Sequence, residues 1–250
     1  MAELLPSAIA IKISEQTNSY ESEVRLSPHP RAVLWDVDGT LIDSADYHWL
    51  TWREVLSREG YDLTHKQFKS SFGQRNDEIL RSYFGSDLPA NEIERIGGAK
   101  EALYREIIRD RGIKPLSGVR RWVKKLNADG WRQAIASSAP LLNIDTILDA
   151  LALEKYFDAI ASAEDVERGK PDPQIFLVAA SKLDVPTTRC IVVEDAPAGV
   201  EAARRASMCS IGVLSSQPTL EADLTVHTLA ELRDDAFDEL LELKRKHLKD

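Results

Sequence analysis

The stretch AVLWDVDGT, residues 32–40, joins a compact apolar run to the pattern Asp-Val-Asp-Gly-Thr. The apolar part is too short for a helix and is typical of a strand that is buried on both faces. Asp36 and Asp38 are two positions apart, so their side chains point to the same side of an extended chain. Gly39 then allows a sharp turn. The stretch predicts a buried strand that presents two carboxylates at its carboxyl end.

More apolar runs of this kind follow along the chain, at residues 133–137, 157–161, 190–194 and 210–214. Helical periodicity fills the gaps around them, at residues 119–127, 141–151, 173–183 and 198–206. Strands that alternate with helices form parallel sheets, because each crossover helix packs on a face of the sheet. We therefore predict an α/β fold with a doubly wound, Rossmann-like parallel sheet.

One gap between predicted strands is too long for a single crossover. Residues 47–111 have helical periodicity and almost no strand signal, which predicts an inserted α-helical cap. Polar residues before a Pro-His-Pro breaker predict a flexible tail at the start of the chain. The predicted units are an N-terminal tail (1–28), a core domain (29–45 and 114–235), a cap domain (46–113) and an amphipathic C-terminal helix (236–250).

Polar residues end the predicted strands, where open α/β sheets bind their ligands. Ser137 ends the second strand, Glu194 and Asp195 end the fourth, and Lys170 opens the helix after the third. Together with the two aspartates of the first strand, the carboxylates would repel each other unless a divalent cation lay among them. Oxygen ligands of this type suit Mg²⁺. Lys170 supplies a positive charge and the hydroxyl of Ser137 supplies a hydrogen bond, and a bound phosphoryl group needs both.

Other chemistries lack their signatures. The chain has no GxxxxGK[ST] loop, no GxGxxG after a strand and no GxSxG elbow, and its histidines lack metal-ligand spacing. A net charge of −9 with no basic stripe argues against nucleic acid as a partner, and no apolar run reaches the roughly 20 residues of a membrane span. We expect a cytoplasmic monomer that acts on a small anionic metabolite, since local charges can oppose the global sign.

Four segments resemble the successive motifs of the haloacid dehalogenase-like (HAD) hydrolase superfamily. They are DVDGTLIDS at 36–44, AS at 136–137, KPDP at 170–173 and EDAPAG at 194–199. Their order and spacing resemble the branch that inserts a helical cap after the first motif. The resemblance implies a HAD core domain with that cap and an Mg²⁺-dependent enzyme that transfers phosphoryl groups.

The resemblance also implies a role for each matching residue. Asp36 is expected to be the nucleophile that forms an aspartyl-phosphate, and Asp38 to be the acid and base. The expected Mg²⁺ ligands are Asp36, Asp38, Glu194 and Asp195, and the expected phosphate contacts are Ser137, Lys170, Gly39 and Thr40. Glu194 contacts the metal either directly or through water.

The cap resembles that of β-phosphoglucomutase and related sugar-phosphate phosphatases at His48, Arg75 and Lys100, which implies contacts with the substrate. The mutase carries a lysine and an asparagine for a second phosphate after the second motif. Residues 138–141 read Ser-Ala-Pro-Leu here, which is similar to the sugar phosphatases. We predict a phosphatase of small phosphorylated sugars that uses an aspartyl-phosphate.

Two alternatives stay open beside the phosphatase. The first is a phosphosugar mutase of the β-phosphoglucomutase type. The second is an idle relative that binds a phosphorylated metabolite, although such a relative is expected to lack Asp36 or Asp38. Each of the three cap residues can also be explained as a surface charge without a role in binding. In that case Arg75 would pair with the acidic residue Asp77 or Glu78.

Overall fold

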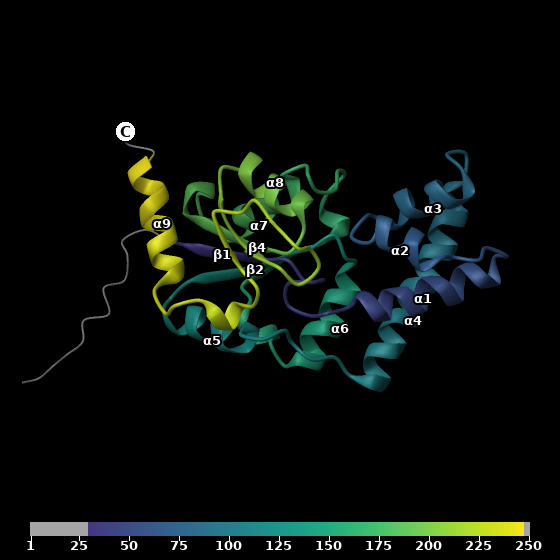
Figure 1. The fold of residues 1–250 in the computed structure, drawn as a ribbon, viewed down its shortest axis with the longest axis horizontal. Helices are drawn as coiled ribbons and strands as arrows, with labels where there is room; N and C mark the ends of the chain where they lie inside the picture. The colour runs from purple at the N-terminus through teal and green to yellow at the C-terminus, as the bar shows by residue number, and fades with distance from the viewer. Residues whose placement is uncertain (1–29, 248–250) are drawn as a thin grey trace, which may run out of the picture.

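The computed structural model describes residues 30–247, so the predicted tail at 1–28 and the last residues of the predicted C-terminal helix, 248–250, lie outside the described residues. Its centre is a parallel sheet of six strands in the order β3-β2-β1-β4-β5-β6 (Figure 1). The strands are β1 (Ala32–Trp35), β2 (Arg132–Ala136), β3 (Ala159–Ala161), β4 (Cys190–Glu194), β5 (Cys209–Val213) and β6 (Leu224–Val226). The predicted sheet is confirmed.

The first strand lies in the middle of this sheet because it pairs on both sides. Trp35 is opposite Ile135 of β2 and Val193 of β4. The three strands therefore end at one level, and the chain continues the sheet pairing one step further, where the Asp36 amide donates to the Val193 carbonyl at 3.1 Å. This register brings polar residues that are far apart in the sequence to one edge.

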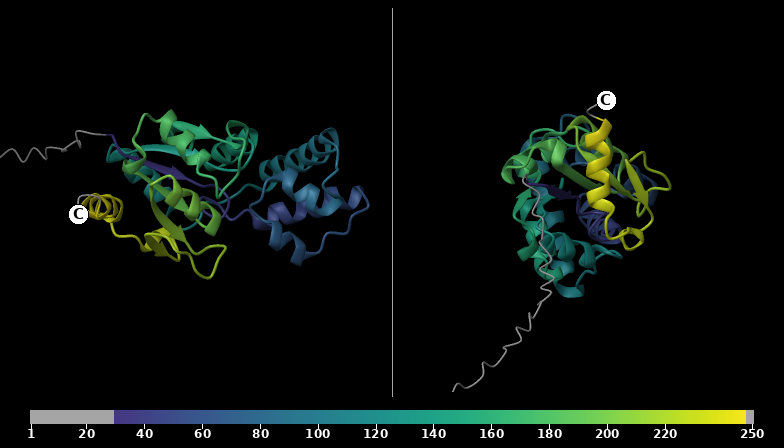
Figure 2. Two further views of the ribbon diagram at one scale, coloured as in Figure 1. Left: turned by 90° about the horizontal axis from the view of Figure 1, so that it is seen from above. Right: turned by 90° about the vertical axis from the view of Figure 1, so that its left-hand side faces the viewer.

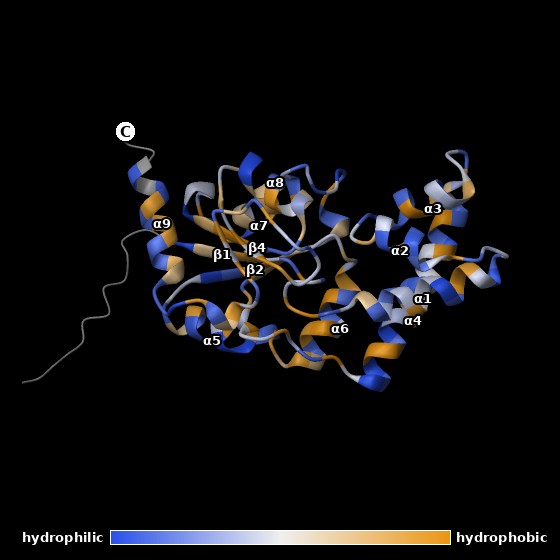
Figure 3. Cartoon of the chain, viewed as in Figure 1, coloured by the Kyte–Doolittle hydropathy of each residue, from blue (hydrophilic) through white to orange (hydrophobic). Residues whose placement is uncertain are grey.

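Helices cover both faces of the sheet. They are α5 (Val119–Ala128), α6 (Leu141–Leu151), α7 (Gln174–Lys182), α8 (Pro197–Arg205) and α9 (Ala236–His247). Helices α5, α6 and α9 share an apolar cluster with Val33 and Trp35 of β1, whereas α7 and α8 pack on Leu34 from the other side. Alternate residues of one strand thus face two cores, and in Figure 3 the apolar residues gather along the central strands and on α6.

Two details differ from the sequence predictions. Helix α7 begins at Gln174, so Lys170 lies in the loop before the helix rather than opening it. Pro171 and Pro173 disfavour helical backbone in the residues that precede them, and the Asp172 carboxylate accepts a hydrogen bond from the Gln174 amide at 3.0 Å. Strand β6 was not predicted, because three half-buried residues are too few to show a period.

The residues between β1 and β2 form the helices α1 (Ala45–Arg58), α2 (His65–Ser71), α3 (Asn76–Phe84) and α4 (Ala90–Arg111). They stand beside the carboxyl edge of the sheet (Figure 2). Trp52, Leu56, Phe68 and Ile96 belong to an apolar cluster of their own. Helix α4 leaves this cluster and buries Tyr104 and Ile108 in the main core, so one continuous helix joins the two parts.

Short 3-10 turns complete the described chain at Glu154–Tyr156, Ala163–Asp165, Thr187–Arg189 and Leu229–Glu231. Of the described helices, none combines the length and the apolar character that crossing a membrane requires.

Candidate active site

Three buried carboxylates meet at the carboxyl edge of the sheet. Asp36 follows β1, Glu194 ends β4 and Asp195 follows it, and one oxygen from each lies within 4.8 Å of the others. They meet because β1 and β4 are neighbours whose ends are level. Like charges at this separation in a poorly hydrated site repel strongly.

Lys170 reaches into this acidic cluster from the loop before α7. Its Nζ lies 2.6 Å from Asp36 Oδ1 and 2.6 Å from Glu194 Oε1. Burial would lower the pKa of Lys170, but the two carboxylates raise it above its ordinary value. Lys170 is therefore held as a cation between the two acidic residues.

One ammonium does not balance three carboxylates, so the cluster keeps two negative charges when all its groups are ionised. Burial, followed by the neighbouring Glu194, raises the pKa of Asp195 to about 7. Burial also raises the pKa of Asp36 well above its ordinary value, although Lys170 opposes this shift. Three oxygen ligands with an excess of two negative charges fit a divalent cation such as Mg²⁺.

Asp38 has different surroundings from Asp36, two residues away. Its Oδ1 accepts a hydrogen bond from the Ser44 hydroxyl and lies 3.2 Å from His48 Nε2 on α1. Burial would raise the pKa of Asp38, but the His48 ring and the Ser44 hydroxyl together hold it below its ordinary value. Environments that push the pKa values of two carboxylates apart are typical of groups with different catalytic tasks.

The turn after β1 packs tightly on the acidic cluster. Gly39 has a φ of +86°, and a Cβ there would lie 2.0 Å from Asp195 Oδ2. Within residues 30–247 the fully buried Oγ1 of Thr40 finds no hydrogen-bond partner. Ser137 is buried, and its Oγ accepts a hydrogen bond from the Ala139 amide at 3.1 Å. Gly39, Thr40 and Ser137 thus all border the carboxyl edge.

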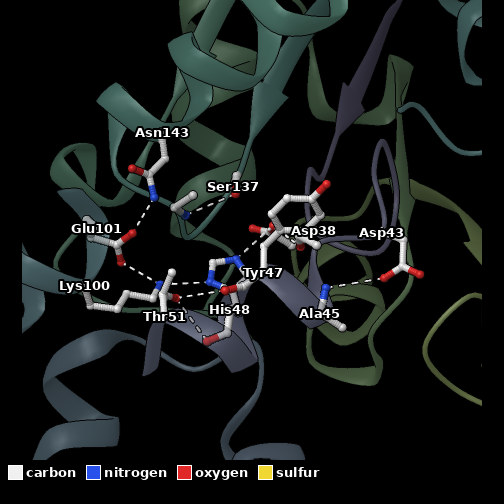
Figure 4. Close-up of polar contacts among 12 residues, drawn as sticks. Asp38, Asp43, Ala45, Tyr47, His48, Thr51, Lys100, Glu101, Ser137 and Asn143 are labelled. Atoms are coloured by element: carbon white, nitrogen blue, oxygen red, sulfur yellow. Dashed lines mark hydrogen bonds and ion pairs between the residues drawn. The ribbon is translucent and has the colours of Figure 1, made fainter. Parts of the chain in front are cut away.

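Two of the three cap residues that the sequence singled out come together. His48 Nδ1 lies 2.9 Å from Nζ of Lys100, which is buried on α4 (Figure 4). Arg75 lies apart from them at the boundary between cap and core. Its guanidinium contacts Asp77 Oδ1 at 3.2 Å and the Val166 carbonyl at 3.5 Å.

Sequence reasoning missed two serines that hold the loops of the site. The Ser215 hydroxyl donates to the Gly39 carbonyl, and the Ser216 hydroxyl donates to the Asp195 carbonyl at 3.1 Å. Both serines follow β5. The signal that identifies them is their position, because Ser215 and Ser216 directly follow the predicted strand at residues 210–214, and polar residues at carboxyl strand ends face the site.

The position of the Glu194 side chain depends on Gly199 of α8, which faces it. Its Oε2 accepts the backbone amides of Asp195 and Ala196, both at 2.8 Å, while Oε1 faces Lys170. A Cβ at Gly199 would lie 1.8 Å from Glu194 Oε1. Gly199 therefore leaves the space that Glu194 occupies.

We predict that Gly199→Ala displaces Glu194 and lowers the rate of phosphate release from p-nitrophenyl phosphate by about 100-fold, a loss that a misplacement of about one ångström can cause. Gly98→Ala is the matched control, because Gly98 is also helical and a Cβ there meets nothing within 4 Å. Melting curves check that both variants fold. Full activity of Gly199→Ala would contradict the role given to this packing.

Comparisons with known proteins agree with the geometry. A family model described as haloacid dehalogenase-like hydrolase matches residues 33–213. Beta-phosphoglucomutase of Bacillus subtilis is 32% identical over 210 residues, which cover 81% of this chain and 91% of that protein. Hexitol phosphatase B of Escherichia coli K12 is 30% identical over 208 residues, which cover 80% of this chain and 93% of that protein.

The fold agrees as well. The crystal structure of beta-phosphoglucomutase from Clostridium difficile matches with a TM-score of 0.75 at 27% identity, over 88% of this chain and 100% of that chain. The predicted family and fold class are thereby confirmed, and the similar proteins include both phosphatases and mutases of phosphorylated sugars. The chain belongs to the haloacid dehalogenase-like hydrolase family.

Proposed function

We propose that this protein is an Mg²⁺-dependent phosphatase of small phosphorylated sugars, with Asp36 as nucleophile and Asp38 as acid and base. The contrast between these two aspartates carries the proposal. Asp36 lies 2.6 Å from the Lys170 ammonium, whereas Asp38 faces the cap and contacts His48. A reaction in two halves needs one carboxylate at phosphorus and another at the leaving oxygen.

In the first half, an Asp36 oxygen attacks phosphorus in line and the bond from phosphorus to the sugar oxygen breaks. For this step Asp38 must carry a proton, against the contacts with His48 and Ser44 that lower its pKa. It gives that proton to the sugar oxygen, so the sugar leaves as an alcohol and an aspartyl-phosphate remains. In the second half, Asp38 takes a proton from water, and the resulting hydroxide attacks phosphorus. The bond to Asp36 breaks, and inorganic phosphate is released.

The phosphoryl group would be held by Lys170, the Ser137 hydroxyl and the turn at Gly39 and Thr40. Lys170 lies against the nucleophile, so its charge offsets the repulsion between Asp36 and an incoming dianion. The buried Thr40 hydroxyl has no partner within the described residues, which leaves it able to bond a phosphate oxygen.

Mg²⁺ would be held by Asp36, the backbone carbonyl of Asp38 and Asp195, with Glu194 nearby. When bound, it would neutralise the charge that a phosphoryl group brings to these carboxylates. The fit rests on the excess of two negative charges in the buried cluster.

One contact favours hydrolysis over the mutase alternative. The Leu141 amide, the first donor of α6, faces both carboxylate oxygens of Glu164, at 3.3 and 3.1 Å, and the preceding Pro140 has no N–H. A second phosphate near Ser137 would meet the negative charge of Glu164 instead of a free donor. The name of hexitol phosphatase B, a similar protein, supports a substrate of the phosphorylated sugar class.

Sugar phosphates should be hydrolysed rather than isomerised. The test is to incubate the protein with a panel of hexose and hexitol monophosphates and Mg²⁺, and to measure free phosphate. A parallel reaction with β-glucose 1-phosphate and a trace of the bisphosphate also follows glucose 6-phosphate. Rapid isomerisation with little free phosphate would favour the mutase, and absence of both products would favour the idle relative.

Substitution of the two aspartates should affect the reaction rate in different ways. Asp36→Asn removes the nucleophile, so we expect rate losses of several orders of magnitude with every phosphate ester. Asp38→Asn removes the acid, which a sugar alkoxide needs and p-nitrophenolate does not, so its loss should be larger with sugar phosphates by roughly 100-fold or more. Steady-state kinetics on both substrates decide. Near-normal turnover by Asp36→Asn would refute the mechanism.

The effect of Mg²⁺ on the stability of the protein should depend on pH, because the proposed ligand Asp195 titrates. Burial raises the pKa of Asp195 from 3.8 to about 7, so between these pH values the folded protein holds a proton that the unfolded chain has lost. This contribution to the free energy of unfolding therefore falls as pH rises toward 7. Mg²⁺ favours the ionised form, so it should raise the melting temperature more at about pH 8 than at about pH 5.

Calorimetry with Mg²⁺ and after chelation measures this difference. The control is Asp195→Asn, which has no carboxyl proton at this position and should lose most of the effect of Mg²⁺. Chelation of the wild-type protein should also stop phosphate release. An equal rise in melting temperature at both pH values, or full activity without metal, would count against the site.

A further inference from the structure

A chain of polar side chains, partly buried at Asp38 and His48 and buried beyond them, runs from Asp38 into the cap and back to the core (Figure 4). Asp38 contacts His48 of α1 at 3.2 Å, and His48 contacts Lys100 of α4 at 2.9 Å. Lys100 donates to Glu101 at 2.9 Å, and Asn143 of the core helix α6 donates to the other oxygen of Glu101. The chain crosses the boundary between cap and core twice.

The donors in this chain have one consistent direction. A lysine ammonium only donates hydrogen bonds, so His48 Nδ1 accepts from Lys100. The neutral His48 ring therefore carries its hydrogen on Nε2 and donates it to Asp38 Oδ1. The position of Lys100 thus determines how His48 meets the proposed acid and base.

Glu101 holds Lys100 and joins three helices. Its buried carboxylate accepts from Asn76 Nδ2 of α3 at 2.7 Å, from Lys100 of α4 and from Asn143 of α6. An ionised carboxylate only accepts, so it satisfies all three donors at once. An amide in its place would turn an NH₂ group toward a donor.

Asn143 is the residue of the core that contacts Glu101, and it is buried. Its Nδ2 donates to Glu101, and its Oδ1 accepts from Arg105 at 2.8 Å, one turn further along α4. Both ends of one side-chain amide are therefore held by the same cap helix. Because α6 begins shortly after Ser137, the contact ties the cap to the segment that borders the phosphate site.

We propose that Glu101 and Asn143 form a clasp between cap and core that positions Asp38 through Lys100 and His48. The proposal rests on the proposed function, since it assumes that Asp38 protonates the leaving oxygen. Glu101 and Asn143 are positioning residues. Their contribution is greatest for substrates whose leaving oxygen needs a proton.

The test begins with Glu101→Gln and Asn143→Asp, each of which leaves two like groups facing each other. With a sugar phosphate, kcat should fall about 10- to 100-fold, a part of what a general acid supplies, while KM changes little. With p-nitrophenyl phosphate, the rate of the first release of p-nitrophenolate, measured before steady state, should stay within about threefold, because this leaving group needs no proton. Amide exchange should become faster in α4 and in the first turn of α6.

The double variant, Glu101→Gln with Asn143→Asp, exchanges the two groups. The amide at 101 can donate to the carboxylate at 143 and still accept from Lys100, so activity and slow exchange should largely return. Thr146→Ala is the matched control. It removes the neighbouring contact between α4 and α6, in which Arg109 donates to Thr146 at 3.5 Å on the exposed side, and it should change neither measurement.

Equal losses in the first half-reaction with both substrates would show general damage and overturn the proposal. A higher KM with unchanged kcat would also overturn it, because that result would indicate a sugar contact. If the wild-type protein releases phosphate from no ester, the proposed function fails. Amide exchange then remains as the test of whether Glu101 and Asn143 hold the cap to the core. Unchanged exchange in both single variants would then refute the proposed clasp.

Discussion

The repulsion among Asp36, Glu194 and Asp195 is the constraint on which the rest of the structure depends. Three carboxylates are buried together, and within residues 30–247 Lys170 is the one ammonium that lies among them. Such a cluster is costly unless cations or hydrogen bonds compensate it. The neighbouring loops serve this need, because Glu194 accepts two backbone amides at the start of α8 and glycines leave room for the acidic side chains.

The same stretch of chain supports two kinds of carboxylate chemistry. Asp36 continues the sheet pairing and stays with the acidic cluster, whereas Asp38 lies beyond the strand and belongs to the contacts of the cap. The difference arises from position alone, since both are aspartates two residues apart. In the proposed mechanism, the core supplies the phosphoryl site and the cap sets the surroundings of the acid and base. Helix α4 connects the two parts, because it contributes to both hydrophobic cores.

The polar network between cap and core differs from the other ion pairs of the chain. Most of these have at least one exposed side chain and contribute little to stability. Lys100, Glu101 and Asn143 are buried, and Lys100 and Asn143 both donate to Glu101, so a mismatch there leaves a charge without a partner. A network of this kind favours one docked arrangement of the cap over others. In the proposed mechanism, that specificity would hold Asp38 in place as the proton donor.

The sequence by itself determined the α/β class, the inserted helices, the family and most of the residues at the carboxyl edge. It did so because strand and helix periods, and motifs such as Asp36-Val37-Asp38-Gly39-Thr40, are local signals. Only the tertiary structure decided that His48 contacts both Asp38 and Lys100, that Glu101 meets Asn143, and that Ser215 holds the turn at Gly39. These contacts join residues far apart in the chain, and no local pattern records which buried donor meets which acceptor once the helices pack.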